Sequence, residues 1–229
     1  MKRVLMTGAA GGLGGRLRKL LKGVYADLRL SDIAVPRDLG KDEEFVRADL
    51  ADMAEVEKAV KGVEGIIHFG GVSIEKPWET IHPANIVGCY NLFEAARRAG
   101  VKRVVFASSN HAVGFYRRTR RIGVGDPGRP DSRYGVSKAF GEALGAFYAD
   151  KFGLGVMCIR IGNVTDKPAD RRRLSIWLAP EDLVQLVRIG LEHPAVRYEI
   201  VFGASDNARG WWDNAPAFRL GYKPKGAAE

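Results

Sequence analysis

Cysteine is nearly absent from this chain: only Cys89 and Cys158 occur among 229 residues. Two cysteines are too few for a disulfide framework, which excludes the small secreted domains that depend on one. Cys158 lies inside the apolar run 156–161, where a buried core thiol is the expected role. We therefore expect a reducing, cytoplasmic setting.

Long apolar runs are lacking as well. No uninterrupted stretch approaches the roughly 20 apolar residues that a membrane-spanning helix requires. The apolar start of the chain is cut by glycines and then followed by Arg16, Arg18, Lys19 and Lys22, a pattern unlike that of a secretory signal. The sequence thus predicts a soluble protein with no membrane partner.

Acidic residues are the minority charge, because 27 Asp and Glu stand against 36 Lys and Arg, for a formal net charge of +9. A positive surface attracts phosphates, so nucleic acid is one candidate partner. The basic residues are dispersed, however, and the densest groups, 117–121 and 171–173, lack the interleaved aromatic residues that stack on bases. Solvated charge, or steering of a small anionic substrate, is the better interpretation, and we expect no nucleic-acid partner.

Hydrophobic residues make up 46% of the chain, enough for one substantial core. Short apolar, β-branched runs alternate with segments of helical periodicity. The expected strands are 3–7, 26–32, 44–46, 65–69, 103–108, 155–161 and 197–202, and the expected helices are 13–21, 53–61, 84–99, 133–151 and 180–191. Continuous apolar strands suit a parallel sheet covered on both faces, so this order predicts an α/β, Rossmann-type doubly wound parallel sheet.

We expect a single domain over residues 1–229. Residues 1–161 would form the nucleotide-binding core and carry the catalytic residues. The pattern loosens after residue 161, so 162–229 would mainly supply a small C-terminal substrate-binding region.

A cluster of glycines follows the first expected strand and opens the first expected helix: Gly8, Gly11, Gly12 and Gly14, with Leu13 between the last two. Glycines permit a tight turn there and let backbone amides at a helix N-terminus approach a pyrophosphate. An ordinary structural turn is the alternative, because spaced glycines alone are weak evidence. The position at the first strand-to-helix junction, where this fold binds dinucleotides, favours a cofactor site.

Acidic and small residues at the ends of later strands complete the expected cofactor site. Asp32 lies eighteen positions past Gly14, where its carboxylate can accept hydrogen bonds from the adenosine ribose; capping a turn is the alternative role. A ribose-binding Asp32 favours NAD as the cofactor. The remaining candidates follow the third and fourth expected strands: Asp49, Leu50, Phe69, Gly70 and Gly71.

Tyr134 and Lys138 are four residues apart, which places them on one face of a helix about one turn from each other. A tyrosine hydroxyl ordinarily keeps its proton near neutral pH, but a nearby ammonium, together with a positive nicotinamide, favours the phenolate. Such a pair is common by chance. Ser109, at the end of the preceding strand, makes this one credible, because its hydroxyl can orient a substrate.

These residues resemble a known pattern. Taken together they look like the extended short-chain dehydrogenase/reductase family, over essentially the whole chain, and the residues that carry the resemblance are Gly8, Gly11, Gly14, Ser109, Tyr134 and Lys138. Within it the chain is similar to uronate dehydrogenases in four separate segments: 69–77, 108–111, 174–177 and 210–214.

The resemblance implies oxidation of a hexuronic acid, such as glucuronate or galacturonate, at the anomeric carbon to an aldarolactone, with NAD accepting the hydride. Tyr134 would take the proton of the anomeric hydroxyl, and Ser109 would hold that hydroxyl in line. Lys138 would bind the nicotinamide ribose and keep Tyr134 acidic. Helices from 84 and 133 would pair across subunits, so we expect a homo-oligomer. We expect no metal at the site.

The resemblance also implies which residues line the sugar pocket: Ser73, Ser109, Asn110, His111, Asn163 and Arg172. Arg172 would bind the substrate carboxylate, with Arg171 and Arg173 as neighbouring alternatives. A structural hydrogen bond is the alternative role for His111. Asn163 departs from the family pattern, in which a serine is expected, so the reach of its hydrogen bonds differs.

Two other functions compete with this hypothesis. A nucleotide-sugar epimerase or dehydratase would share the cofactor site, Tyr134 and Lys138, but it would need a larger second domain or an acidic residue near Ser109. A dinucleotide-binding regulatory protein would keep the fold without turnover. The intact set of Ser109, Tyr134 and Lys138 argues against the regulatory alternative.

Overall fold

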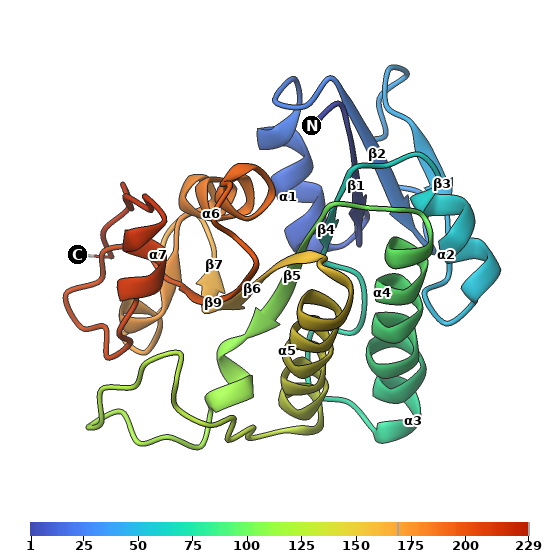
Figure 1. Ribbon diagram of the computed structural model, residues 1–229. Helices are drawn as coiled ribbons and strands as arrows, with labels where there is room; N and C mark the ends of the chain where they lie inside the picture. Colours follow the sequence, from blue (N-terminus) through green and yellow to red (C-terminus); the bar gives the residue numbers. More distant parts are fainter. Residues whose placement is uncertain (169, 229) are drawn as a thin grey trace.

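The computed structural model describes residues 1–168 and 170–228, and its main sheet has seven strands that all pair in parallel (Figure 1). Their spatial order is β3-β2-β1-β4-β5-β6-β9, which reverses direction at β1. The strands are β1 (Arg3–Thr7), β2 (Asp27–Asp32), β3 (Phe45–Arg47), β4 (Gly65–His68), β5 (Arg103–Ser109), β6 (Gly155–Ile161) and β9 (Tyr198–Gly203). This order is that of a Rossmann-type doubly wound fold, as the sequence predicts.

Helices cover both faces of the sheet, because the continuous apolar strands must be buried on both sides (Figure 1). The main helices are α1 (Gly12–Leu21), α2 (Met53–Val60), α4 (Gly88–Arg98), α5 (Arg133–Phe152) and α6 (Pro180–Glu192). Side chains of β1 alternate between two cores: Val4 and Met6 pack with α1 and α6, whereas Leu5 packs with α2, α4 and α5. The sheet is thus the middle of three layers.

Local capping fixes where the helices begin and end. The Asp52 carboxylate accepts hydrogen bonds from the backbone N–H groups of Ala54 and Glu55, so α2 begins at Met53. The Ser132 hydroxyl accepts one from Gly135 N–H and starts α5, which ends where Gly153 adopts a left-handed φ of 71°. The boundaries predicted from the sequence agree with most of the observed ones to within one or two residues.

The largest difference lies before residue 84. The sequence predicts a helix over 84–99, but the chain is already helical from Trp78, through α3 (Trp78–Ile81) and a π-helical stretch (His82–Val87) that leads into α4. Pro83 has no N–H and therefore looks like a helix start. Its carbonyl nevertheless accepts a hydrogen bond from Gly88 N–H, five residues on, which lets the helix pass through the proline.

The C-terminal part of the chain contributes to the core as well as to the site. β9 is the edge strand of the central sheet next to β6, and α6 packs against that sheet, so much of 162–229 extends the Rossmann core. The remaining elements are short: β7 (Asn163–Val164), β8 (Trp177–Leu178), α7 (Ala215–Arg219) and the 3₁₀ turns Asn110–Val113 and Arg173–Ser175. β7 and β8 pair in a small parallel sheet that leads the chain from β6 to α6.

Cys89 and Cys158 are free thiols in the core, as expected for Cys158, and burial raises the pKa of Cys89 to about 12. A buried thiol of this kind is chemically inert. In the part of the chain that the structure describes, no helix combines the length and the apolar character that crossing a membrane requires.

Candidate active site

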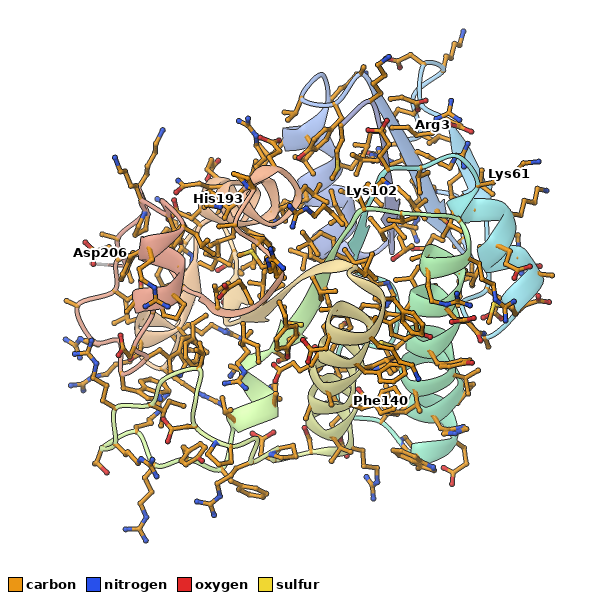
Figure 2. The ribbon with its side chains drawn as sticks, viewed as in Figure 1. Arg3, Lys61, Lys102, Phe140, His193 and Asp206 are labelled. Atoms are coloured by element: carbon orange, nitrogen blue, oxygen red, sulfur yellow. The ribbon has the colours of Figure 1, made fainter. Side chains whose placement is uncertain are left out.

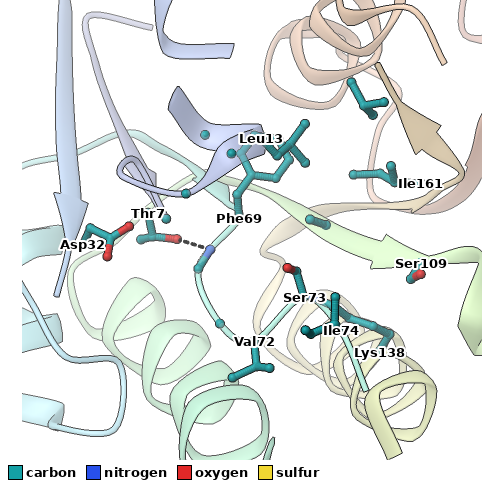
Figure 3. A pocket seen from close by; sticks show the side chains of 18 of the residues that line it. Thr7, Leu13, Asp32, Phe69, Val72, Ser73, Ile74, Ser109, Lys138 and Ile161 are labelled. Atoms are coloured by element: carbon teal, nitrogen blue, oxygen red, sulfur yellow. Dashed lines mark hydrogen bonds between the residues drawn. The ribbon is translucent and has the colours of Figure 1, made fainter. Parts of the chain in front are cut away.

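A cavity of about 980 Å³ opens at the carboxyl edge of the sheet, where β1, β2, β4, β5 and β6 end. The opposite edge, where β1 begins at Arg3 and β5 follows Lys102, carries charged side chains (Figure 2). Asp32 and Ser109 lie toward opposite ends of the cavity, with the glycine turn and the segment 69–74 between them (Figure 3). Every residue proposed from the sequence for the site lines this cavity except Arg172.

The glycine turn between β1 and α1 is shaped to hold a phosphate group. Gly8 has a left-handed φ of 73°, and its carbonyl accepts a hydrogen bond from Gly11 N–H. A Cβ on Gly14 would lie 2.0 Å from the Gly8 carbonyl oxygen, so only glycine lets the helix approach the turn this closely. A Cβ on Gly12 would meet no atom within 4 Å, which shows that this residue faces the open cavity.

The N-terminus of α1 has no side-chain cap and no acidic residue in its first turn. Its first backbone N–H groups and the positive end of the helix dipole are therefore available to an anion. The cavity also lies at the strand reversal next to β1, where doubly wound folds bind dinucleotides. These features fit the pyrophosphate of NAD: Gly12, Leu13 and Gly14 would offer their backbone N–H groups to it, and Gly11, whose N–H is bonded to Gly8, shapes the turn that holds it.

Asp32 ends β2 and has a structural task besides lining the cavity. Its carboxylate accepts hydrogen bonds from the backbone N–H of Ala10, at 3.0 Å, and from that of Ala34, at 3.3 Å. The turn-capping role and the ribose-binding role that the sequence leaves open are thus compatible in one side chain. Asp49 and Leu50 follow β3, and Leu50 also packs against the backbone of Gly70.

The segment after β4 is tied to β1 by a buried hydrogen-bond pair. The Thr7 hydroxyl accepts a hydrogen bond from Gly70 N–H at 3.2 Å (Figure 3) and lies 2.7 Å from Nδ1 of His68. Burial, followed by the charge of Lys138, lowers the pKa of His68 to about 3. The imidazole therefore stays neutral, and its Nδ1 can accept the Thr7 hydroxyl proton, which places Phe69, Gly70 and Gly71 along the cavity wall.

Further along, Asn85 links the same segment to α5. Its side-chain oxygen accepts from Val72 N–H at 2.7 Å, and its amide nitrogen donates to Val72 O and to the Ser137 hydroxyl, both at 2.9 Å. Glu75 continues the link, because its carboxylate accepts from Tyr134 N–H at 3.0 Å. Ser73 is thus carried on a segment that is fixed to α5 on both sides. No sequence motif marks Asn85, and Glu75 lies within the segment 69–77 that carries the family resemblance, but that resemblance gave it no role of its own.

Ser109, Tyr134 and Lys138 all line the cavity, each less than a tenth exposed. Ser109 ends β5, and the other two lie on the first turns of α5. Nζ of Lys138 is 5.5 Å from the centroid of the Tyr134 ring and 5.1 Å from that of Phe106. The structure therefore places a hydroxyl, a phenol and an ammonium on the wall of one cavity, as the sequence predicts.

The expected sugar-binding residues lie at the Ser109 end. Asn110 and His111 form the 3₁₀ turn after β5, and the Ser109 hydroxyl accepts a hydrogen bond from His111 N–H at 3.2 Å. Asn163, on β7, lines the cavity from the other side. Side-chain amides and an imidazole can each donate and accept hydrogen bonds, which suits a polyhydroxylated ligand.

The arginine of the run 171–173 that lines the cavity is not the one expected from the sequence. Arg172 is exposed and does not line the cavity, whereas Arg173 does and pairs with Asp170 at 3.1 Å. A short 3₁₀ turn that begins at Arg173 explains the change, because it rotates successive side chains by about a third of a turn. The assignment of the substrate carboxylate to Arg172 is therefore not supported by this arrangement of side chains.

Arg16 also lines the cavity, although no sequence motif marks it as a site residue. It lies on α1 and forms an ion pair with Asp166, which follows β7. The pair joins the glycine turn, at the cofactor end, to the segment that carries Asn163. Only the fold brings these two residues together, because 150 positions separate them in the chain.

Comparison with known proteins is consistent with this geometry. Residues 4–193 match the NAD dependent epimerase/dehydratase family. The uronate dehydrogenase of Pseudomonas putida is 52% identical over 228 residues, which cover 99% of this chain and 85% of the relative.

Solved structures agree closely in fold. The uronate dehydrogenase of Agrobacterium tumefaciens, as a tyrosine-to-alanine mutant complexed with NAD, has a TM-score of 0.96 and 48% identity, over 100% of this chain and 86% of that one. The glucuronic acid dehydrogenase of Chromohalobacter salexigens also has a TM-score of 0.96, with 46% identity over the same shares.

Proposed function

The chain belongs to the NAD dependent epimerase/dehydratase family, and from this premise we propose that it is an oxidoreductase that converts a hexuronic acid to an aldarolactone with NAD. Glucuronate and galacturonate are the candidate substrates. The observation that carries the proposal is the meeting of Ser109, Tyr134 and Lys138 inside the dinucleotide cavity. The similarity of the whole chain to uronate dehydrogenases supports the choice of substrate.

The chain's own residues divide the chemistry between them. Ser109 donates a hydrogen bond to the anomeric hydroxyl and orients it, while Tyr134, as the phenolate, takes the proton of that hydroxyl. The Lys138 ammonium lies beside the Tyr134 ring, where a positive charge stabilises a phenolate, and it would hold the nicotinamide ribose. NAD, when bound, accepts the hydride from the anomeric carbon. Burial of all three side chains excludes water and strengthens these interactions.

Substrate recognition is assigned to the side chains around Ser109. Ser73, Asn110, His111 and Asn163 would bind the sugar hydroxyls. A guanidinium of the run 171–173 would bind the carboxylate, because a planar guanidinium can form two parallel charge-assisted hydrogen bonds with it. The resemblance favours Arg172, and the cavity wall favours Arg173.

Cofactor choice is assigned to Asp32. Its carboxylate would accept hydrogen bonds from the free ribose hydroxyls of NAD and repel the 2′-phosphate of NADP. We also propose a cytoplasmic homo-oligomer. The exposed aromatic side chains Tyr90, Phe147 and Phe152 on α4 and α5 offer a subunit contact, and two free core thiols suit a reducing compartment.

The test is to incubate purified protein with NAD or NADP and a panel of glucuronate, galacturonate, glucose and UDP-glucose, while following the absorbance of the reduced cofactor. We expect uronate oxidation with a kcat/KM at least about thirtyfold above that for glucose, because glucose lacks the carboxylate. NADP should be at least about tenfold less efficient than NAD. Turnover of UDP-glucose without uronate turnover would favour the epimerase alternative, and no turnover of any sugar would favour a regulatory protein.

A further inference from the structure

His111 lies next to the proposed base at the substrate end of the cavity. Its ring meets the Tyr134 ring edge-on, with centroids 5.7 Å apart and an interplanar angle of 67°. It is partly exposed, at 38%, and lines the cavity beside Ser109 and Asn110. A small rotation of this ring would therefore change the shape and the hydrogen bonding of the site where a substrate must fit.

Asp131 contacts this ring at Nδ1. One of its carboxylate oxygens, Oδ1, lies 2.8 Å from Nδ1 of His111, and its backbone N–H donates to the His111 carbonyl at 3.3 Å. An ionised carboxylate can only accept hydrogen bonds, so Nδ1 must carry the proton. Nε2 is then the nitrogen that a neutral His111 ring presents as an acceptor.

Asp131 is itself fixed on two sides. The Ser132 hydroxyl donates to the same Oδ1 at 3.0 Å, and Ser132 also caps the N-terminus of α5. A Cβ on Gly114 would lie 2.0 Å from the other carboxylate oxygen, so the carboxylate packs closely over Gly114. The orientation of His111 is thereby linked to the start of the helix that carries Tyr134 and Lys138.

We propose that Asp131 is a positioning residue for substrate binding: by holding Nδ1 of His111, it presents Nε2 to a hydroxyl group of the sugar. The sugar hydroxyl donates the hydrogen bond and the neutral imidazole accepts it. The choice of a sugar as the ligand rests on the proposed function, whereas the positioning role rests on the contacts of Asp131. Asp131 touches neither the proton nor the hydride that is transferred.

The kinetic test compares Asp131→Ala with Asp131→Asn, using glucuronate and galacturonate as substrates. Asp131→Ala should raise KM about tenfold, with kcat changed less than about threefold, because a charge-assisted hydrogen bond to the ring is lost. Asp131→Asn should recover much of this loss, since its amide oxygen can still accept from Nδ1–H. Asp126→Asn is the matched control. Asp126 lies in the same loop, but it pairs with Arg120 and accepts a hydrogen bond from Gly123 N–H, so the KM of this variant should stay at the wild-type value.

A second pair of variants separates positioning from folding. In a His111→Ala background, Asp131→Ala should add no further rise in KM, whereas a purely structural role would add the same rise as in the wild type. Unfolding temperature and NAD affinity are measured for each variant. An unchanged KM in Asp131→Ala, or additive effects in the double variant, would overturn the inference.

A spectroscopic readout does not depend on the substrate. The chain has only four histidines, so the ring nitrogens of His111 can be assigned in ¹⁵N NMR spectra by comparison with His111→Ala. At alkaline pH, where the ring is neutral, the wild type should carry the proton on Nδ1, Asp131→Asn should largely keep it there, and Asp131→Ala should shift it toward Nε2. If no uronic acid is oxidised, the proposed function fails, but these spectra still decide whether Asp131 fixes the ring. Equal spectra in wild type and Asp131→Ala would contradict the inference.

Discussion

The two ends of the cavity are built in different ways. At the cofactor end, Gly8 to Gly14 and Asp32 belong to consecutive strand–helix units, and the ligand-facing groups are largely backbone amides. At the substrate end, His111 and Arg173 come from 3₁₀ turns and Asn163 from the short strand β7, all far apart in the chain, and the ligand-facing groups are side chains. A backbone site tolerates few changes in local shape, whereas a side-chain site changes its specificity with single residues.

The largest expected effect is at the point where the two ends meet. Tyr134→Phe removes the proton acceptor but keeps the ring that packs beside Lys138 and His111. Turnover should fall about a hundredfold or more, as is usual when positioned acid–base catalysis is lost. NAD affinity, measured by titration calorimetry, should barely change. Wild-type turnover in this variant would mean that another group is the base.

The next effect in size tests the substrate end. Loss of the guanidinium that binds the carboxylate should cost about 2–4 kcal/mol, or roughly thirty- to a thousandfold in kcat/KM for the uronate. Alanine substitutions of Arg171, Arg172 and Arg173, each measured for kcat/KM and for NAD affinity, locate it. We expect one large loss, at Arg172 or Arg173, with NAD affinity retained. Small losses at all three positions would remove the arginine run from substrate recognition.

The smallest expected effect is at the cofactor end, where it is tested by two substitutions on α1, Gly14→Ala and Gly15→Ala. A Cβ on Gly14 would collide with backbone atoms of Gly8, whereas the nearest atom to a Cβ on Gly15 is 3.7 Å away, which is ordinary contact. Gly14→Ala should therefore weaken NAD affinity about tenfold by displacing the turn. Gly15→Ala should leave NAD affinity unchanged and raise the free energy of unfolding by up to about 1 kcal/mol. Equal NAD affinities in the two variants would show that the tight turn is not needed.

The contrast between the two ends of the cavity also explains which features the sequence predicts well. The periodicity of apolar residues places the strands and most helices to within one or two residues, because each element buries its own apolar face. The glycine turn and Asp32 carry local signals that act over a few residues. Tyr134 and Lys138 are recognisable for the same reason, since four positions fix their relation on a helix.

The substrate end depends on contacts that leave no local signal. Asp131 and His111 are 20 positions apart in the sequence, and the ion-paired residues Arg16 and Asp166 are 150 positions apart. The 3₁₀ turn at Arg173–Ser175 decides which arginine faces the cavity. A single turn is too short to produce a periodic pattern in the sequence, so it cannot be predicted from one. Only the resemblance to a family points to the proposed substrate-binding residues, because physical patterns in the sequence do not reveal them.

Hydride transfer from the anomeric carbon is the central claim, and isotope labelling tests it most directly. Purified protein is given NAD and glucuronate that carries deuterium at the anomeric carbon, and the reduced cofactor is analysed by mass spectrometry. The account predicts that each turnover moves one deuterium to the cofactor and that the sugar product is an aldarolactone free of the label. Deuterium retained in the sugar while reduced cofactor accumulates would contradict it, because the hydride would then come from another carbon.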